Sequence, residues 1–214
     1  MEFSTAIIDY DAGNLHSVLR ACREVGLDAG ITNNPEIVAQ AERVIFPGVG
    51  AAGSAMQSLR QSGLDQALHA AVNRGVPVLG ICLGCQISLT HSEENDTITL
   101  GLIQGEVRRF AFDRPDLKVP HIGWNELEVL QPHPVLADIE VDDAFYFVHG
   151  YYCEPADPKQ VYAVTDYETR FCSAMGFKNY FATQFHPEKS GRVGLRLLEN
   201  FSRWDPNQGV EHAE

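Results

Sequence analysis

The sequence predicts an α/β fold with a mostly parallel, doubly wound sheet, followed by a more antiparallel second half. Two observations indicate this fold. Up to about residue 90, short apolar runs rich in β-branched residues alternate with segments that carry apolar residues at helical spacing. After Gly101 the helical spacing gives way to short strand-like runs separated by turns. A length of 214 residues suits one core, so we expect one domain over 1–204 and a polar tail over 205–214.

The first elements follow from apolar spacing and from residues that end helices. Residues 5–9 form a short apolar run and are predicted as the first strand. The next apolar residues share one helical face, and Gly26 ends that helix before a second predicted strand at 27–31. The face consists of Leu15, Val18, Leu19, Cys22 and Val25.

The next helices and strands follow in the same alternation. Asn34 before Pro35 is typical of a helix start, because Asn caps free N–H groups and Pro suits the first helical turn. A third strand is predicted at 43–46, a helix with a break at Gly63 at 51–73, and a fourth strand at 76–81. This order favours parallel strands joined by helices.

Five further strand-like runs make the second half more antiparallel. They lie at 105–110, 126–130, 144–148, 161–166 and 173–177. A strand at 180–184 and a helix at 192–204 complete the predicted domain.

Cys82 has the surroundings of a catalytic nucleophile. It stands in Gly80-Ile81-Cys82-Leu83-Gly84, directly after the fourth strand and before a predicted helix at 83–90. Flanking glycines allow a sharp strand-to-helix turn, and the start of a helix supplies N–H groups that stabilise negative charge. The simpler alternative is a buried cysteine at a strand end.

A base with an orienting group follows the last predicted strand. His186-Pro187-Glu188 comes directly after residues 180–184, and Pro187 holds the two flanking side chains in a rigid turn. Parallel strands bring their carboxyl ends to one edge of the sheet, so Cys82 and His186 are expected to meet there. A surface histidine in a proline turn is the simpler alternative.

Composition limits the function classes without choosing one. A net charge of −13 argues against nucleic acids and anionic membranes as partners. No signal peptide and no apolar run of about 20 residues is present. Five irregularly spaced cysteines fit a reducing compartment, so we expect a cytoplasmic protein. No pattern predicts a metal site or a cofactor.

Several motifs together resemble the class I (triad) glutamine amidotransferases, from about residue 6 to residue 203. The superfamily is marked by Gly-Ile-Cys-Leu-Gly-Cys-Gln at 80–86 and Gln-Phe-His-Pro-Glu-Lys-Ser at 184–190. Gly-Asn-Leu at 13–15 and Pro-His-Ile-Gly-Trp-Asn at 120–125 resemble the branch of glutaminase subunits of imidazole glycerol phosphate synthase. The resemblance implies the family's three-layer fold.

The resemblance also implies a glutaminase and its site residues, with no cofactor and no metal. Cys82, His186 and Glu188 would form the catalytic triad. The oxyanion hole would come from Gly48, Val49, Gly50 and Leu83. Glutamine would be bound by Gln86, Gly150 and Tyr151.

For this branch the implied partner is a (β/α)₈ cyclase subunit, bound as a heterodimer. Ammonia released from glutamine would pass to the cyclase, which makes imidazole glycerol phosphate and aminoimidazole carboxamide ribotide in histidine biosynthesis. The resemblance places five residues at the docking face: Asn14, His121, Trp124, Asn125 and Tyr146.

Three alternatives stay open from the sequence. Related amidotransferase subunits of surface-polysaccharide pathways share much of this pattern. Cys85 makes a C-x-x-C with Cys82 at the start of a helix, which is also typical of a thioredoxin-like redox protein. The third alternative is a scaffold with a vestigial triad, which the complete set of Cys, His and Glu disfavours.

Overall fold

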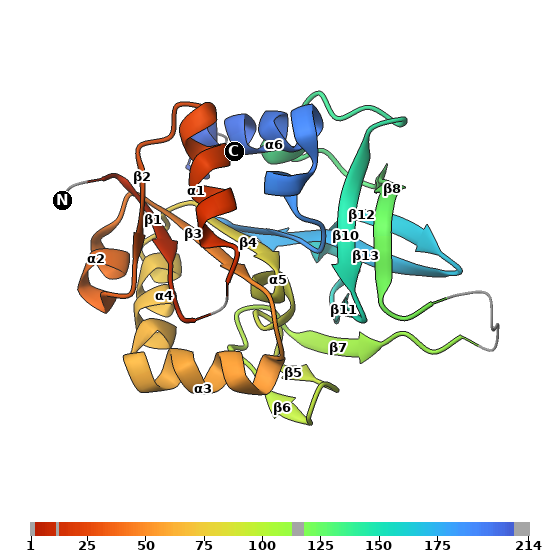
Figure 1. The fold of residues 1–214 in the computed structure, drawn as a ribbon, viewed down its shortest axis with the longest axis horizontal. Coiled ribbons are helices and arrows are strands. Elements are labelled where there is room, and N and C mark those ends of the chain that lie inside the picture. The colour runs from red at the N-terminus through yellow and green to blue at the C-terminus, as the bar shows by residue number, and fades with distance from the viewer. Residues whose placement is uncertain (1–2, 12, 113–117, 208–214) are drawn as a thin grey trace, which may run out of the picture.

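Five parallel strands form the core of the main sheet, in the order β2-β1-β3-β4-β14 (Figure 1). The computed structural model describes residues 3–11, 13–112 and 118–207. The five strands are β1 (Thr5–Ile8), β2 (Ala29–Thr32), β3 (Arg43–Gly48), β4 (Val78–Cys82) and β14 (Tyr180–Thr183). The predicted parallel sheet is confirmed.

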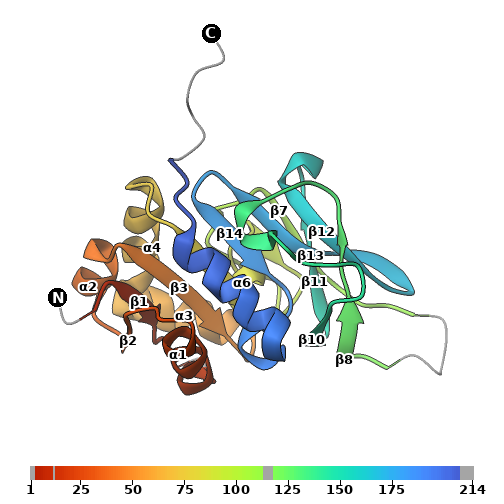
Figure 2. The ribbon, with the colours of Figure 1, turned by 90° about the horizontal axis from the view of Figure 1, so that it is seen from above.

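Helices cover both faces of this sheet and make three layers (Figures 1 and 2). One face carries α1 (Leu15–Glu24) and α6 (Gly191–Arg203). The other carries α2 (Pro35–Gln40), α3 (Ala52–Ser62) and α4 (Leu64–Asn73). Successive strand residues point to opposite faces, so β1, β3, β4 and β14 contribute apolar side chains to both helical layers, whereas those of β2 lie on the side of α1 and α6.

The sheet continues beyond β14 with mostly antiparallel strand pairs, as the sequence predicts. It runs through β13 (Thr169–Phe177), β11 (Tyr151–Pro155), β7 (Gly105–Arg109), β5 (His91–Ser92) and β6 (Thr97–Ile98), with β12 (Val161–Tyr167) and β9 (Glu128–Val129) at its side. A separate antiparallel ribbon consists of β8 (His121–Glu126) and β10 (Ala144–His149). Short 3₁₀ turns are η1 (Pro134–Leu136), η2 (Pro158–Gln160) and η3 (Pro187–Lys189).

Two predicted helix boundaries are confirmed with their physical causes. Asn34 caps α2, since its side-chain oxygen accepts a hydrogen bond of 2.9 Å from the Glu36 N–H. Gly63 separates α3 from α4 with a φ of 74°, a conformation that glycine adopts without strain.

The helix predicted at 83–90 is wrong in length. Only α5 (Leu83–Gln86), a single turn, forms there. The Ser88 and Leu89 N–H groups bond to carbonyls three residues back, those of Cys85 and Gln86, and the Thr90 N–H donates to the distant Gly105 carbonyl at 3.2 Å. Bonds to the carbonyl four residues back therefore end at Ile87, and the helix does not continue past its first turn.

Other differences lie in the strands and the tail. The sequence patterns did not predict β5, β6, β8 or β11, and the second strand lies at Ala29–Thr32 in place of 27–31. β3 continues through Pro47 and Gly48, two residues beyond the strand predicted at 43–46. Of the predicted tail, residues 208–214 lie outside the described residues. Among the described helices, none combines the length and apolar character of a membrane span.

Close packing of α5 against β3 predicts the effect of a small substitution. A Cβ at position 84 would lie 1.9 Å from the Phe46 carbonyl oxygen, so Gly84→Ala forces α5 away from the strand. We expect the free energy of unfolding to fall by roughly 1–3 kcal/mol, measured by chemical denaturation.

Gly53→Ala is the matched control within a helix. A Cβ there meets Thr97 Oγ1 at 3.5 Å, an ordinary contact, so replacing a helical glycine should stabilise the protein by about 0.5–1 kcal/mol. Equal effects of the two substitutions would contradict the packing argument.

Candidate functional site

Cys82 stands at a strained turn where β4 passes into α5. It is the last residue of β4, with φ 53° and ψ −105°, which a non-glycine side chain rarely adopts. Such a conformation costs about 1–3 kcal/mol and is typical of functional sites. The strand-to-helix elbow predicted around Cys82 is thus present in the geometry.

Gly80 and Gly84 were predicted to permit the sharp turn itself. In the structure they permit close packing of neighbouring strands. The positive φ falls on Cys82, and neither Gly80 nor Gly84 has one. A Cβ at Gly80 would lie 2.3 Å from the Tyr180 hydroxyl, and a Cβ at Gly84 would clash with the Phe46 carbonyl. These two glycines let β14 and β3 approach the elbow closely.

His186 and Glu188 form a buried pair directly after β14. His186 Nδ1 and Glu188 Oε1 are 2.7 Å apart, and the side chains are 2% and 1% exposed. The His186 N–H donates to the Tyr146 carbonyl at 2.9 Å. Behind the turn, Gly194 of α6 packs so closely that a Cβ there would lie 1.9 Å from the Pro187 carbonyl oxygen.

Strand register brings Cys82 and His186 together. Cys82 lies opposite Gly48 across β3 and β4, and its neighbour Ile81 lies opposite Thr183 of β14. Burial disfavours a charged imidazole, but the interactions with Cys82 and with the bound carboxylate of Glu188 outweigh it and raise the pKa of His186 to about 10.

The free nitrogen of His186 is available for proton transfer. Among the described residues, Nε2 has no aligned hydrogen-bond partner, although the ring interacts with Cys82 electrostatically. A buried imidazole with Nδ1 on a carboxylate and Nε2 beside a thiol has the arrangement of a general base and its orienting group.

Asn14 supports the triad from the start of α1. Its side-chain N–H donates a short hydrogen bond to Glu188 Oε1, the oxygen that also binds His186. The sequence resemblance placed Asn14 at the partner face. The structure places its side chain, which is half-buried, on the Glu188 carboxylate.

A buried amide pair connects the elbow to β11. Gln86 Nε2 donates to the Tyr151 carbonyl at 2.8 Å and to Gln184 Oε1 at 3.2 Å, and Gln184 Nε2 donates to Cys82 Sγ at 3.9 Å. Gln184 was missed by the sequence reasoning. It lies two residues before His186, and side chains two apart on an extended chain share a face.

The segment predicted to form the oxyanion hole lies beside the elbow. Gly48 pairs with Cys82, and a Cβ there would lie 1.9 Å from the Tyr10 hydroxyl. Gly50 has a φ of 113°, and Val49 between them is 37% exposed. Leu83 begins α5 directly after the thiol. Farther along, Gly150 is half-buried, and its carbonyl accepts from the Phe110 N–H.

The residues predicted at the partner face divide between surface and interior. Trp124 is 58% exposed, and its ring contacts the ring of Tyr146. The Lys189 Nζ lies 5.8 Å from the centroid of the Tyr146 ring. His121 is buried at 3% exposure, so its side chain lies beneath this face. Asn125 donates to the Asp166 carbonyl at 3.0 Å and so joins β8 to β12.

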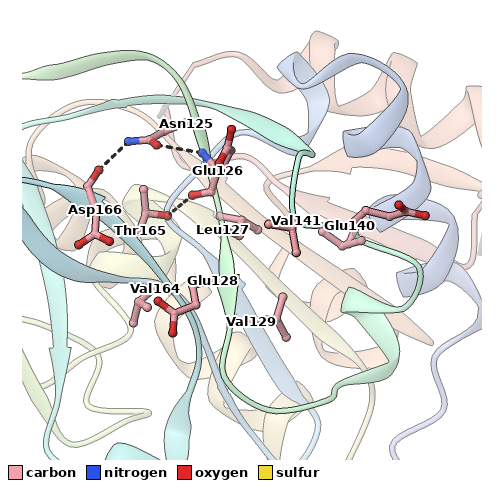
Figure 3. Close-up of a pocket in the computed structure, with 11 residues that line it drawn as sticks. Asn125, Glu126, Leu127, Glu128, Val129, Glu140, Val141, Val164, Thr165 and Asp166 are labelled. Carbon is pink, nitrogen blue, oxygen red and sulfur yellow. Dashed lines mark hydrogen bonds between the residues drawn. The ribbon is translucent and has the colours of Figure 1, made fainter.

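A hollow of about 350 Å³ has none of Cys82, His186 and Glu188 among its lining residues, which Figure 3 shows. It is bordered by β8, β9 and β12, and four of its lining residues are acidic: Glu126, Glu128, Glu140 and Asp166. Its lining residues include neither a thiol nor a histidine, so it lacks the chemical groups that the Cys82 elbow offers. Within the described residues, no three His, Cys, Asp or Glu side chains are placed to hold a metal ion.

The second thiol of the C-x-x-C points into the core. Cys85 Sγ lies 3.6 Å from Cys153 Sγ, and both residues are 1% exposed. Burial and the contact with Cys153 raise the pKa of the Cys85 thiol well above its usual range. This arrangement removes the accessible dithiol that the redox alternative requires.

Known proteins match the chain over nearly its whole length. The model of the glutamine amidotransferase class-I family matches residues 6–203. The HisH subunit of imidazole glycerol phosphate synthase from Desulfovibrio desulfuricans is 50% identical, covering 98% of this chain and 99% of that protein. The HisH subunit from Acinetobacter baylyi is 46% identical, covering 94% of this chain and 98% of that protein.

Solved structures show the same fold at lower identity. The structure of PurLQS from Thermotoga maritima aligns with a TM-score of 0.73 at 18% identity, covering 94% of this chain and 98% of that one. A glutamine amidotransferase crystal structure aligns with a TM-score of 0.69, covering 93% of this chain and 99% of that one. The chain therefore belongs to the class I glutamine amidotransferases, and within them to the family of HisH subunits of imidazole glycerol phosphate synthase.

Proposed function

We propose that this chain is the glutaminase subunit of imidazole glycerol phosphate synthase and that Cys82, His186 and Glu188 perform its chemistry. The observation that carries the proposal is the strained elbow, which presents the Cys82 thiol to a buried histidine–carboxylate pair. Identity of about 50% to HisH subunits favours histidine biosynthesis over the surface-polysaccharide pathways.

The proposed reaction begins with attack of the Cys82 thiolate on the side-chain amide carbon of glutamine. His186, protonated at Nε2, gives its proton to the leaving ammonia, and the acyl group stays on sulfur as a thioester. His186 then takes a proton from water, which hydrolyses the thioester to glutamate and restores the thiolate. Glu188 holds Nδ1 and stabilises the imidazolium, and Asn14 holds Glu188.

Charge on the tetrahedral oxygen requires N–H donors beside the elbow. We assign them to Leu83 and to the segment of Gly48, Val49 and Gly50, because both border Cys82. Loss of one such donor typically costs about 10²–10³ in kcat. Gln86 and Tyr151 would contact the amino-acid end of glutamine, together with the main chain of Gly150.

Released ammonia would pass to a (β/α)₈ cyclase subunit in a heterodimer. The proposed docking face centres on Trp124 and Tyr146, because an exposed tryptophan beside a tyrosine is a typical interface anchor.

We also propose one domain over residues 1–204. All five cysteines are free and buried, which supports a cytoplasmic location.

Replacing the nucleophile should remove glutaminase activity without unfolding the protein. Cys82→Ala is expected to lower glutamate release by at least about 10³-fold, because no other group can form the thioester. With the cyclase present, added ammonium should still drive synthesis. Cys172→Ala, a buried thiol outside the triad, is the control and should keep its activity. Retention of more than a few per cent activity in Cys82→Ala would exclude this role.

Removing the carboxylate should shift the alkaline limb of the pH profile. Glu188 raises the pKa of His186, so Glu188→Gln lowers it, and the proton needed by the leaving ammonia is lost at a lower pH. We expect kcat/KM to fall by roughly 10²–10⁴ and its alkaline limb to move to lower pH. Glu199→Gln on α6 is the control. An unmoved limb would show that Glu188 does not act through His186.

The isolated chain should be a poor glutaminase that its partner activates. Gly48 and Gly50 allow the peptide between them to reorient, and docking near Trp124 could favour the orientation that binds the oxyanion. Glutamate release would be compared for the chain alone, with cyclase, and with cyclase plus its nucleotide ligand. We expect an increase of roughly 5–150-fold. Equal rates in all three samples would contradict activation.

A further inference from the structure

Gln184 is a fully buried polar residue that contacts the Cys82 sulfur. It follows β14 directly and has 0% exposure. Its amide nitrogen lies 3.9 Å from Cys82 Sγ, and its amide oxygen lies 3.2 Å from Gln86 Nε2. Its backbone N–H donates to the Ser173 carbonyl at 2.9 Å, which fixes the start of the side chain.

The direction of these hydrogen bonds follows from one acceptor. The Tyr151 carbonyl oxygen can only accept, so Gln86 must turn its NH₂ group toward it. The same NH₂ group faces Gln184, which must therefore present its oxygen to Gln86. This leaves the NH₂ group of Gln184 facing Cys82. The donor that reaches the sulfur is thus determined by a carbonyl on β11.

Of two buried histidines in contact with each other, His149 also binds the Tyr151 carbonyl. His149 Nδ1 lies 2.7 Å from the Tyr151 oxygen and must carry a proton to bind it. Burial lowers the pKa of His149 to about 3 and that of His121 to about 4, so both rings are neutral at pH 7. His149 Nε2 then accepts from His121 Nδ1 at 3.2 Å. In this series of hydrogen bonds from His121 to Cys82, donor and acceptor are therefore assigned at each step.

We propose that Gln184 is a positioning residue for Cys82, holding the sulfur through its amide N–H and stabilising the negative charge of the thiolate. The inference rests on the proposed role of Cys82 as nucleophile. A hydrogen bond to an ionised acceptor is roughly twice as strong as a neutral one. An amide does not exchange its proton in catalysis, so Gln184 favours the thiolate without competing with His186.

Other titratable groups near the sulfur do not replace this donor. Tyr10, Cys85 and His186 interact with Cys82 electrostatically. The Tyr10 hydroxyl has no hydrogen-bond partner among the described residues, the Cys85 thiol contacts Cys153, and His186 has its own role in proton transfer. In the part of the chain that the structure describes, Gln184 is the side-chain amide bound to the thiol.

Two substitutions separate the donor from the shape of the side chain. Gln184→Met keeps the length and removes the N–H group. Gln184→Glu keeps the shape but places acceptor oxygens and negative charge beside the sulfur. Gln131→Met is the matched control: the Gln131 amide donates to the carbonyls of Lys159 and Val161 at 2.8 and 2.7 Å, outside the site.

The test is the rate at which iodoacetamide alkylates Cys82 in the full chain, followed by mass spectrometry from pH 6 to pH 10. At pH 7 we expect Gln184→Met to react about tenfold more slowly than wild type and Gln184→Glu more slowly still. The difference in alkylation rate between the variants and wild type should narrow toward pH 10, where thiol ionisation no longer needs the donor. With the cyclase bound, kcat should fall and KM should change little. Gln131→Met should match wild type.

Each outcome bears on one assignment. Wild-type alkylation rates and kcat in Gln184→Met would overturn the inference, and so would a loss that is constant across pH, which indicates a structural role only. If Gln184→Met does not fold, Gln184→Asn takes its place, since it keeps the amide but withdraws it by one methylene. Failure of Cys82 itself to react in wild type would instead overturn the nucleophile assignment.

Discussion

The parallel pairing of β4 with β14 is the constraint on which the site depends. These strands are far apart in the chain, yet their register places Val78 opposite Tyr180 and Ile81 opposite Thr183. Parallel strands end at the same edge, so the elbow after β4 and the His-Pro-Glu turn after β14 emerge side by side. A shift of one residue would turn the side chains of β14 to the opposite face and separate the base from the thiol.

Close backbone contacts keep this edge rigid. Gly80 lets the Tyr180 ring lie against β4, Gly84 lets α5 touch β3, and Gly194 lets α6 lie on the Pro187 turn. Each contact leaves no room for a Cβ, so the elements around the triad are fixed by sterics as well as by hydrogen bonds. Such packing also maintains the strained backbone of Cys82, since an isolated turn would relax. The buried pair of His186 and Glu188 is held in the same way, by Asn14 on one side and by α6 on the other.

The ribbon of β8 and β10 connects the exposed face to the triad. Within its register, Trp124 lies opposite Tyr146 at the surface, and His121 lies opposite His149 in the interior. The Tyr146 carbonyl accepts from the His186 N–H, and His149 binds the Tyr151 carbonyl that orients Gln86. The ribbon thus connects the proposed docking face, the proposed base His186 and the amide pair beside Cys82. A partner that moves this ribbon would act on all three at once.

The sequence by itself determined the parallel first half, the elbow at Cys82, the His-Pro-Glu turn and the family, because each depends on local spacing or on a contiguous motif. Tertiary structure alone decided the rest. α5 stops after one turn, and the Thr90 N–H binds the distant Gly105 carbonyl in place of a helical one. The side chain of Asn14 binds Glu188, and that of His121 lies in the interior, where ring stacking with Phe147 and Tyr167 surrounds it. Gln184 reaches Cys82 through the orientation of Gln86. These contacts join residues far apart in the chain, and no local pattern records which distant group a buried donor or acceptor will meet.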